Sequence, residues 1–194
     1  MSPCILWIDE IEKGLAGATS GAGDGGTSTR LVGQFLYWLQ EARARVFVVA
    51  TANDVSKLPP ELLRRGRFDE LFFVDLPTPV ERREIIDIYV KRGLKQEQPS
   101  ELMDELVEAS DGFAGSDLEA AVREVVKEAY LNGDAAVTPD LFRQSFRNVV
   151  PLSKTAPEQI ESIRAWGRER AVPASGHPIG MAATQGRPRR QVLG

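Results

Sequence analysis

The chain has 194 residues, of which 42% are hydrophobic and 27% are charged, proportions typical of a soluble globular protein. This composition excludes a fibrous repeat and a chain that is disordered throughout. With 24 basic residues against 28 acidic ones, the net charge of −4 gives no general attraction to nucleic acid, and no apolar run reaches the roughly 18 residues that span a bilayer.

Three short apolar runs in the first part of the chain are predicted to be β-strands. They comprise residues 4–8, 46–50 and 71–76. Continuous apolar runs of this length are typical of parallel strands that are buried on both faces. Between them, hydrophobic residues recur at helical spacing from Leu31 to about Arg43, and Pro59-Pro60 opens a short helix through Arg64. Strands that alternate with helices indicate an α/β layer.

Residues 14–29 are rich in Gly, Ala, Ser and Thr and are predicted to form a mobile loop. Gly21, Gly23 and Gly26 have the spacing of a dinucleotide-binding fingerprint, but that motif must follow a strand and open a helix. Here a polar segment precedes the glycines, and Thr27 stands where a phosphate-binding loop requires lysine. The flexible-loop interpretation is therefore preferred to a nucleotide-binding role.

After Pro77 and Pro79 the sequence shows helical patterns only. Four helices are predicted, over residues 80–92, 100–109, 116–131 and 138–149, with Ser116 as an N-cap and Glu119 three residues later. A fifth helix is predicted over residues 157–170, followed from Ala171 by a disordered basic tail. The predicted boundaries are 1–78 for the α/β part, 79–150 for the helical unit and 151–194 for the C-terminal helix and tail.

Two acids and an amide follow the first two predicted strands, at the edge where α/β folds bind their ligands. Asp9 and Glu10 come directly after the first strand, and Asn53 follows the second. One carboxylate can hold Mg²⁺ through water and the other can polarise an attacking water, while the amide can orient that water. The alternatives are that the acids begin a helix, where its dipole favours negative charge, and that Asn53 is an ordinary turn residue.

Arg64, Arg65 and Arg67 surround Gly66 and form the most concentrated basic group in the first half of the chain. A guanidinium offers a planar set of donors that suits a phosphoryl group in transfer. The alternative is a solvated basic surface, which is the usual role of an arginine cluster.

Four blocks of the sequence, read in chain order, resemble the AAA family of ring-forming ATPases. They are PCILWIDEIEK, VVATAND, LPPELLRRGRFDE and DGFAGSDLEAAVREV, and the resemblance covers residues 3 to about 149. The string WIDEIEKG, the Gly/Ser insert and the PLSKT block resemble most the AAA proteins encoded in algal plastid and cyanobacterial genomes. The resemblance implies the C-terminal part of a P-loop NTPase parallel sheet followed by a small four-helix lid.

The resemblance also implies roles for individual residues. By position these are Asp9 on Mg²⁺, Glu10 activating water, Asn53 as sensor 1, Arg64 and Arg67 as arginine fingers acting in trans, and Gly115 and Ser116 near adenine and ribose. The implied cofactors are ATP and Mg²⁺, and the implied partners are other AAA subunits in a ring, expected to be hexameric, and a protein substrate, without nucleic acid or membrane. The single cysteine, Cys4, fits a reducing compartment, and we expect the cytoplasm or the plastid stroma.

The sequence departs from the family pattern in one important way, because it contains no G-x-x-x-x-G-K-[ST] phosphate loop. Lesser departures are Asp54-Val55, where the family has a basic residue and proline, and Glu70, where arginine is usual. We therefore expect an N-terminally truncated ATPase that is inactive alone and exposes uncovered apolar strands. The alternative is a non-catalytic interaction module that docks on full-length AAA subunits.

Overall fold

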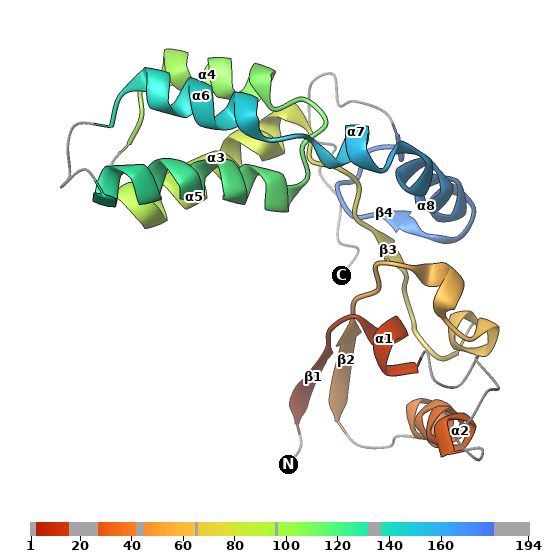
Figure 1. Cartoon of the computed structure of the whole chain (residues 1–194). Coiled ribbons are helices and arrows are strands. Elements are labelled where there is room, and N and C mark those ends of the chain that lie inside the picture. The colour runs from red at the N-terminus through yellow and green to blue at the C-terminus, as the bar shows by residue number, and fades with distance from the viewer. Residues whose placement is uncertain are drawn as a thin grey trace, which may run out of the picture. The chain divides into compact units, whose positions relative to one another are not determined.

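The computed structural model describes residues 3–15, 27–41, 45–64, 66–95, 97–131 and 137–180 (Figure 1). The chain forms two compact units, Met1–Leu71 and Phe72–Gly194, which are described separately. This division lies before the predicted boundary at residue 78. No helix within the described ranges is long and apolar enough to cross a membrane.

The sheet of the first unit consists of two parallel strands, β1 (Cys4–Ile8) and β2 (Val46–Ala50). Their register pairs Cys4 with Val46 and continues without a break to the pair of Ile8 and Ala50. Both strands lie where the apolar runs predict them. Because they are parallel and end at the same register position, the residues that follow them meet at one edge.

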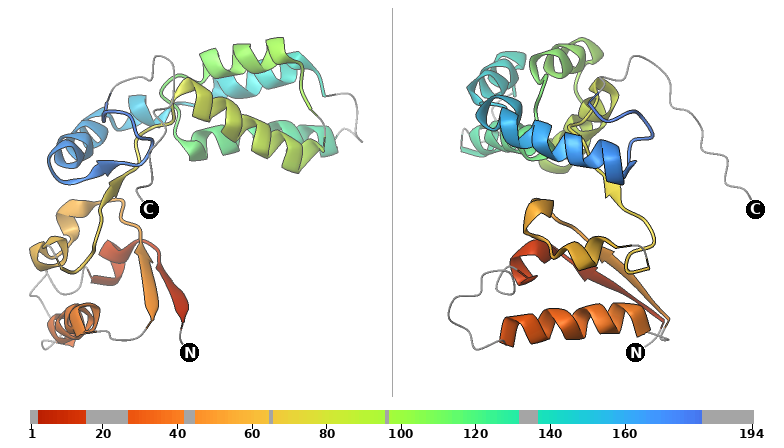
Figure 2. Two further views of the ribbon diagram at one scale, coloured as in Figure 1. Left: turned by 180° about the vertical axis from the view of Figure 1, so that it is seen from behind. Right: turned by 90° about the vertical axis from the view of Figure 1, so that its right-hand side faces the viewer.

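Helices cover one side of this strand pair (Figures 1 and 2). They are α1 (Ile11–Leu15), α2 (Thr27–Glu41) and the 3₁₀ turns η2 (Val55–Lys57) and η3 (Pro60–Leu63). The buried members of their core are Ile11, Leu15, Val32, Leu58 and Leu62, against which Ile8 and Ala50 of the strands pack. The Pro60–Leu63 turn matches the short helix predicted there.

The predicted loop over residues 14–29 is partly replaced by helix. Gly14 and Leu15 belong to α1, and Thr27 begins α2, so both ends of the segment continue regular structure. Residues 16–26, which include the three glycines of the fingerprint, lie outside the described residues. Helix α2 thus begins before Leu31, where the predicted apolar spacing starts. The spacing does not reveal this first turn because the residues of the turn are polar.

The other side of the strand pair exposes large apolar side chains. Ile5 is 74%, Trp7 is 62% and Phe47 is 68% exposed. Ile5 pairs with Phe47 in the register, and side chains at positions i and i+2 of a strand point to the same face, so these three form one apolar surface. Parallel sheets normally carry helices on both faces, and among the described residues none covers this one.

The second unit is built around four helices, in agreement with the predicted helical unit. They are α3 (Pro79–Leu94), α4 (Ser100–Ala109), α5 (Gly115–Leu131) and α6 (Pro139–Asn148). Their apolar faces form one core, whose fully buried members include Ile86, Leu106, Leu118, Val125, Phe142 and Phe146. Figure 2 shows this group from two further sides.

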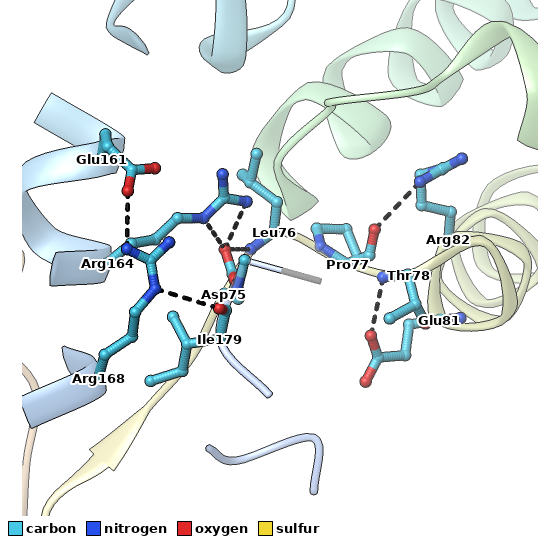
Figure 3. A network of polar contacts seen from close by, with 11 residues as sticks. Asp75, Leu76, Pro77, Thr78, Glu81, Arg82, Glu161, Arg164, Arg168 and Ile179 are labelled. Atoms are coloured by element: carbon cyan, nitrogen blue, oxygen red, sulfur yellow. Dashed lines mark hydrogen bonds and ion pairs between the residues drawn. The ribbon is translucent and has the colours of Figure 1, made fainter. Parts of the chain in front are cut away.

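Helix caps explain where two of these helices begin. Thr78 Oγ1 accepts from Glu81 N at 3.3 Å and Glu81 Oε2 accepts from Thr78 N at 2.9 Å, a reciprocal capping box that starts α3 (Figure 3). Helix α5 begins at Gly115, so the prediction of Ser116 as its N-cap is wrong. Instead Asp117 Oδ2 accepts from Ala114 N at 2.8 Å.

A buried arginine joins the start of this unit to its core. Arg82 donates to the carbonyl of Pro77 at 3.2 Å (Figure 3). Two of its nitrogens also donate to the carbonyl of Val107, at 3.1 and 3.3 Å. Burial lowers the pKa of the Arg82 guanidinium, while nearby Asp111 acts in the opposite direction. These carbonyl contacts hold the segment before α3 against the C-terminal end of α4.

The C-terminal part of the chain differs from its prediction. Helix α8 (Pro157–Arg170) lies where predicted, preceded by the unpredicted short helix α7 (Leu152–Thr155). Strand β4 (Val172–Pro173) then pairs in parallel with β3 (Phe72–Phe73). The predicted third strand over residues 71–76 is therefore shorter than expected and pairs within the second unit. Residues 171–180 are ordered, against the prediction of a disordered tail, and 181–194 lie outside the described residues.

Asp75 holds this C-terminal segment in place (Figure 3). Its Oδ1 accepts from Leu76 N and from Arg164 Nε and forms an ion pair with Arg164 Nη2, and its Oδ2 accepts from Gly180 N, each at 2.8 Å. Nearby, Arg168 Nε donates to the carbonyl of Ile179 at 3.3 Å. One carboxylate thus connects the chain after β3, helix α8 and the end of the described segment.

Replacing Asp75 by alanine removes the acceptor of three hydrogen bonds and leaves the Arg164 guanidinium without its ion-pair partner. We expect the free energy of unfolding to fall by about 2 kcal/mol and trypsin to cleave faster after Arg170. Urea denaturation and timed proteolysis measure the two effects. The matched control is Asp104→Ala, which removes an exposed carboxylate paired with Arg83 and should change little. Equal effects of the two substitutions would contradict the role of Asp75.

Candidate active site

Thr51 organises the edge at which β1 and β2 end. Its backbone N–H donates to Ile8 O and its carbonyl accepts from Ile11 N, both at 2.9 Å, which extends the strand pairing by one step. Its hydroxyl donates to Asp9 Oδ1 at 2.6 Å and accepts from Glu10 N at 3.0 Å. Sequence reasoning missed this residue, although its position directly after the second apolar run was a usable signal.

Glu10 has an unusual backbone conformation. Its φ is +48°, in the left-handed region that residues other than glycine rarely adopt. The N–H bond to Thr51 and the start of α1 at the next residue hold it there. Such conformations are maintained where the surroundings fix them, and they are concentrated at functional sites. This turn directs the chain from β1 into α1 within two residues.

Both carboxylate oxygens of Glu10 have partners. Asn53 Nδ2 donates to Oε1 at 2.8 Å, and Lys13 Nζ donates to Oε2 at 2.6 Å. The hydrogen bond to Glu10 raises the pKa of Lys13 above its usual value, so the lysine is charged at neutral pH. The structure therefore brings together Asp9, Glu10 and Asn53, as their positions after the strands predict, and adds Lys13 to them.

Glu12 is a second residue that sequence reasoning missed. It lies on α1, only 3% of its surface is exposed, and its Oε1 accepts from Asn53 N at 3.1 Å. Its Oε2 has no hydrogen-bond partner within the part of the chain that the structure describes. The string DEIE contained a signal, because a third acid two positions after Glu10 falls on the first turn of the following helix.

Asp9 is the residue of this edge that is suited to Mg²⁺. It is exposed, and its Oδ1 accepts from Thr51, which leaves Oδ2 for water or a cation. The described residues contain no group of three or more His, Cys, Asp or Glu side chains arranged to hold a metal ion. Mg²⁺ commonly binds through one or two carboxylates with water and substrate phosphates, so the side chains fit a nucleotide-bound ion and not a stand-alone metal site.

The arginines near Gly66 have different environments. Arg67 is half-buried and its Nη1 donates to the carbonyl of Leu36 at 2.6 Å, which ties this turn to α2. Arg64 is exposed, and its guanidinium has no partner among the residues described. Arg65 lies outside the described residues, and Gly66 has a φ of +89° at the turn between the two.

Gly115 and Ser116 belong to the second unit, in the first turn of α5. Ser116 is exposed, and a Cβ built on Gly115 would meet no atom within 4 Å, so the space beside this turn is open. They are not part of the first unit, which contains Asp9, Glu10 and Asn53.

A hollow in the first unit lies at the opposite end of the strands. It has a volume of about 480 Å³, is open to solvent and is lined by Pro3, Cys4, Ile5, Arg45, Val46 and Phe47. Asp9, Glu10 and Asn53 follow the other ends of the same strands. The hollow is therefore separate from the candidate site.

Comparison with known proteins connects this geometry to a family. Residues 1–76 match the model of the family described as ATPase family associated with various cellular activities (AAA). The chain is 44% identical over 166 residues to the uncharacterized AAA domain-containing protein ycf46 of Pyropia yezoensis, covering 86% of this chain and 33% of the relative. The ycf46 protein of Guillardia theta is 41% identical, with coverage of 86% and 32%. The chain thus spans about a third of the length of these relatives.

A further relative and a solved structure extend the comparison to sequence and to fold, respectively. The ATP-dependent zinc metalloprotease FtsH 4 of a Synechocystis strain is 36% identical over 154 residues, which is 77% of this chain and 24% of the relative. The AAA domain of FIGL-1 in complex with ADP superposes with a TM-score of 0.68 at 22% identity, covering 86% of this chain and 57% of that structure. The likeness confirms the predicted α/β fold class with parallel strands followed by a helical part.

Replacing Thr51 by valine keeps the shape of the side chain but removes the hydroxyl. Glu10 N–H then lacks its acceptor and Asp9 lacks a donor, so we expect the first unit to lose about 1 kcal/mol of unfolding free energy. Urea denaturation, monitored by the fluorescence of Trp7 and Trp38, measures the loss. Thr51→Ser retains the hydroxyl, so its free energy of unfolding should lie closer to that of the unmodified chain. If serine and valine destabilise equally, the hydroxyl does not hold the edge together.

Proposed function

Because this chain contains part of an AAA domain, we propose that its first unit supplies the hydrolytic half of a Mg²⁺–ATP site in a ring of AAA subunits. The observation that carries the proposal is the 2.8 Å hydrogen bond from Asn53 Nδ2 to Glu10 Oε1, beside Asp9, at the carboxyl edge of two parallel strands. Ligands of α/β sheets bind at this edge.

Glu10 has the chemistry of the general base in this proposal. Its carboxylate takes a proton from a water whose oxygen bonds to the γ-phosphorus, while the bond from that phosphorus to the β–γ bridging oxygen breaks. The products are ADP and inorganic phosphate. Asn53 orients the carboxylate through Oε1, so the base is held in one rotamer before substrate arrives.

Lys13 competes for the same carboxylate. Its ammonium occupies Glu10 Oε2 in an ion pair whose lysine side chain is 70% exposed. Exposed ion pairs contribute little net stability and exchange readily with water, so this oxygen becomes free when Lys13 swings into solvent. In the proposed mechanism the pair is the resting arrangement, and water replaces the ammonium on Oε2 before hydrolysis.

Asp9 is the residue that would hold Mg²⁺, through Oδ2 and a bridging water. The ion would neutralise charge on the β- and γ-phosphate oxygens. Thr51 fixes the other carboxylate oxygen, so Asp9 keeps a constant position at the edge.

The arginines near Gly66 have separate roles in the proposal. Arg64, exposed and without a partner among the described residues, extends to the nucleotide of a neighbouring subunit, where it stabilises charge in the transition state. Arg67, the other expected arginine finger, donates to the carbonyl of Leu36, and we propose that this bond holds the turn that carries both arginines. Gly115 and Ser116 are proposed to lie against the adenine and ribose.

The sequence contains no phosphate loop. The residues proposed for hydrolysis are therefore present without the residues that would bind the phosphates. Without the backbone amides and lysine of such a loop, nothing cradles the phosphates in place. We expect the purified chain to show no ATP turnover above the rate in buffer when phosphate release is measured with excess Mg²⁺–ATP. Turnover that disappears in Glu10→Gln would contradict this expectation and would place a complete site in the chain.

A second candidate function is a docking module that acts on full-length AAA subunits. It is favoured by the exposed apolar surface of Ile5, Trp7 and Phe47 and by the guanidinium of Arg64, which has no partner in the described part of the chain. As a docking module, the chain would supply Arg64 to a ring of other subunits and would perform no hydrolysis itself. Both candidate functions use the same residues. They differ in which polypeptide binds the nucleotide.

Mixing the chain with a full-length AAA relative, such as the ycf46 protein of Pyropia yezoensis, tests the role of Arg64. We expect the chain to change the ATPase rate of the relative at least twofold, and Arg64→Ala to remove at least nine-tenths of that change. The matched control is Arg30→Ala, an exposed arginine on α2, which should retain the effect. An unchanged rate and an unchanged size distribution on gel filtration would count against docking.

A further inference from the structure

Glu12 is a buried carboxylate that the proposed mechanism does not use. It is 3% exposed and lies beside Ile11 on α1, among the apolar residues of the first unit's core. Only Oε1 is paired, and Oε2 is without a partner in the described residues. An unpaired buried oxygen of this kind costs stability, which an apolar side chain or a longer hydrogen-bonded network would avoid. Its single bond is therefore the feature to explain.

That bond ends on the backbone of Asn53. Glu12 Oε1 accepts from Asn53 N at 3.1 Å, and the side chain of the same asparagine donates to Glu10 Oε1 at 2.8 Å. Asn53 follows β2 in irregular backbone, beyond the last pair of the strand register, where no ladder fixes its position. Asn53 is therefore held at two points. Glu12 of α1 accepts from its backbone N–H, and Glu10, the residue before α1, accepts from its side-chain amide.

We propose that Glu12 is a positioning residue, which anchors the backbone of Asn53 so that the asparagine amide holds the carboxylate of Glu10. The inference rests on the proposed function for its catalytic meaning, because it is Glu10 that would act on water. Glu12 itself contacts neither the water nor the metal: it is buried, and no acidic or histidine cluster able to hold a metal includes it within the described part of the chain.

To anchor Asn53 N–H, the side chain at position 12 must have the length of glutamate and an acceptor oxygen at its end. Glutamine has the same reach as glutamate and keeps an acceptor oxygen, whereas aspartate keeps the charge but is shorter by one methylene. The proposal therefore predicts that Glu12→Gln preserves the bond to Asn53 N–H and that Glu12→Asp breaks it. A role that depended on the negative charge would give the opposite order.

Amide hydrogen exchange of the full chain, followed residue by residue by NMR without nucleotide, tests the proposal. The reference is Thr51 N–H, which donates to Ile8 O in the strand ladder. Relative to that reference, we expect exchange at Asn53 N–H to accelerate at least tenfold in Glu12→Asp and to stay within threefold in Glu12→Gln. The side-chain amide resonances of Asn53 should move in Glu12→Asp toward their positions in Glu10→Ala, where the acceptor is absent.

A control separates positioning from general loosening of the core. Leu15→Ala removes a buried side chain from the same helix, so it should lower the unfolding temperature while the ratio of Asn53 to Thr51 exchange stays unchanged. The proposal is overturned if Glu12→Asp leaves Asn53 protected, if Glu12→Gln loses protection as Glu12→Asp does, or if Leu15→Ala gives the same local effect. Because no nucleotide is present, a failure of the proposed ATPase function would leave this result intact.

Discussion

The parallel pairing of β1 and β2 is the constraint on which the rest of the first unit depends. The register carries the strands to the pair of Ile8 and Ala50, and Thr51 then bonds to both Ile8 and Ile11 through its backbone. Two chain segments more than forty residues apart therefore leave the sheet at one point. Asp9, Glu10 and Asn53 meet because their strands end together. Asp9 then lies within hydrogen-bond distance of Thr51, and Glu10 within that of Asn53. A shift of register by one residue would separate them and reverse the faces of the strands.

Polar contacts at this edge form a graded series from buried to exposed. Glu12 is buried and bonds to backbone, Asn53 and Thr51 connect backbone to side chain, and Glu10 ends the series in an exposed ion pair with Lys13. Fixed groups on the inner side and an exchangeable partner on the outer side are what a preorganised base requires, because only the outer contact has to change when water enters. The left-handed backbone of Glu10 fits the same description, since it is held by its neighbours on both sides.

The sequence was sufficient to predict those features that depend on local pattern. The two strands, helix α8 and the placement of Asp9, Glu10 and Asn53 at one edge follow from apolar runs, periodicity and the position of each residue after its strand. Features that depend on distant partners were missed. Residues 171–180 have the composition of a disordered tail, yet Asp75 holds them through Arg164 and Gly180, which are 89 and 105 positions away in the sequence. Glu12 was missed for a related reason, because burial of a glutamate depends on the packing of the whole unit.

The same two strands that assemble the polar edge leave the first unit incomplete in another respect. All the contacts that position the proposed base and its amide, including the bond from Asn53 N to Glu12 of α1, lie within residues 8–53. Covering the apolar surface of Ile5, Trp7 and Phe47 requires a further layer, and cradling phosphates requires a loop that this sequence does not contain. Under the proposed function, the residues that would activate water are thus present without a loop that would bind the phosphates. The first unit would then supply one side of a nucleotide site, and activity would require a surface that provides the other side.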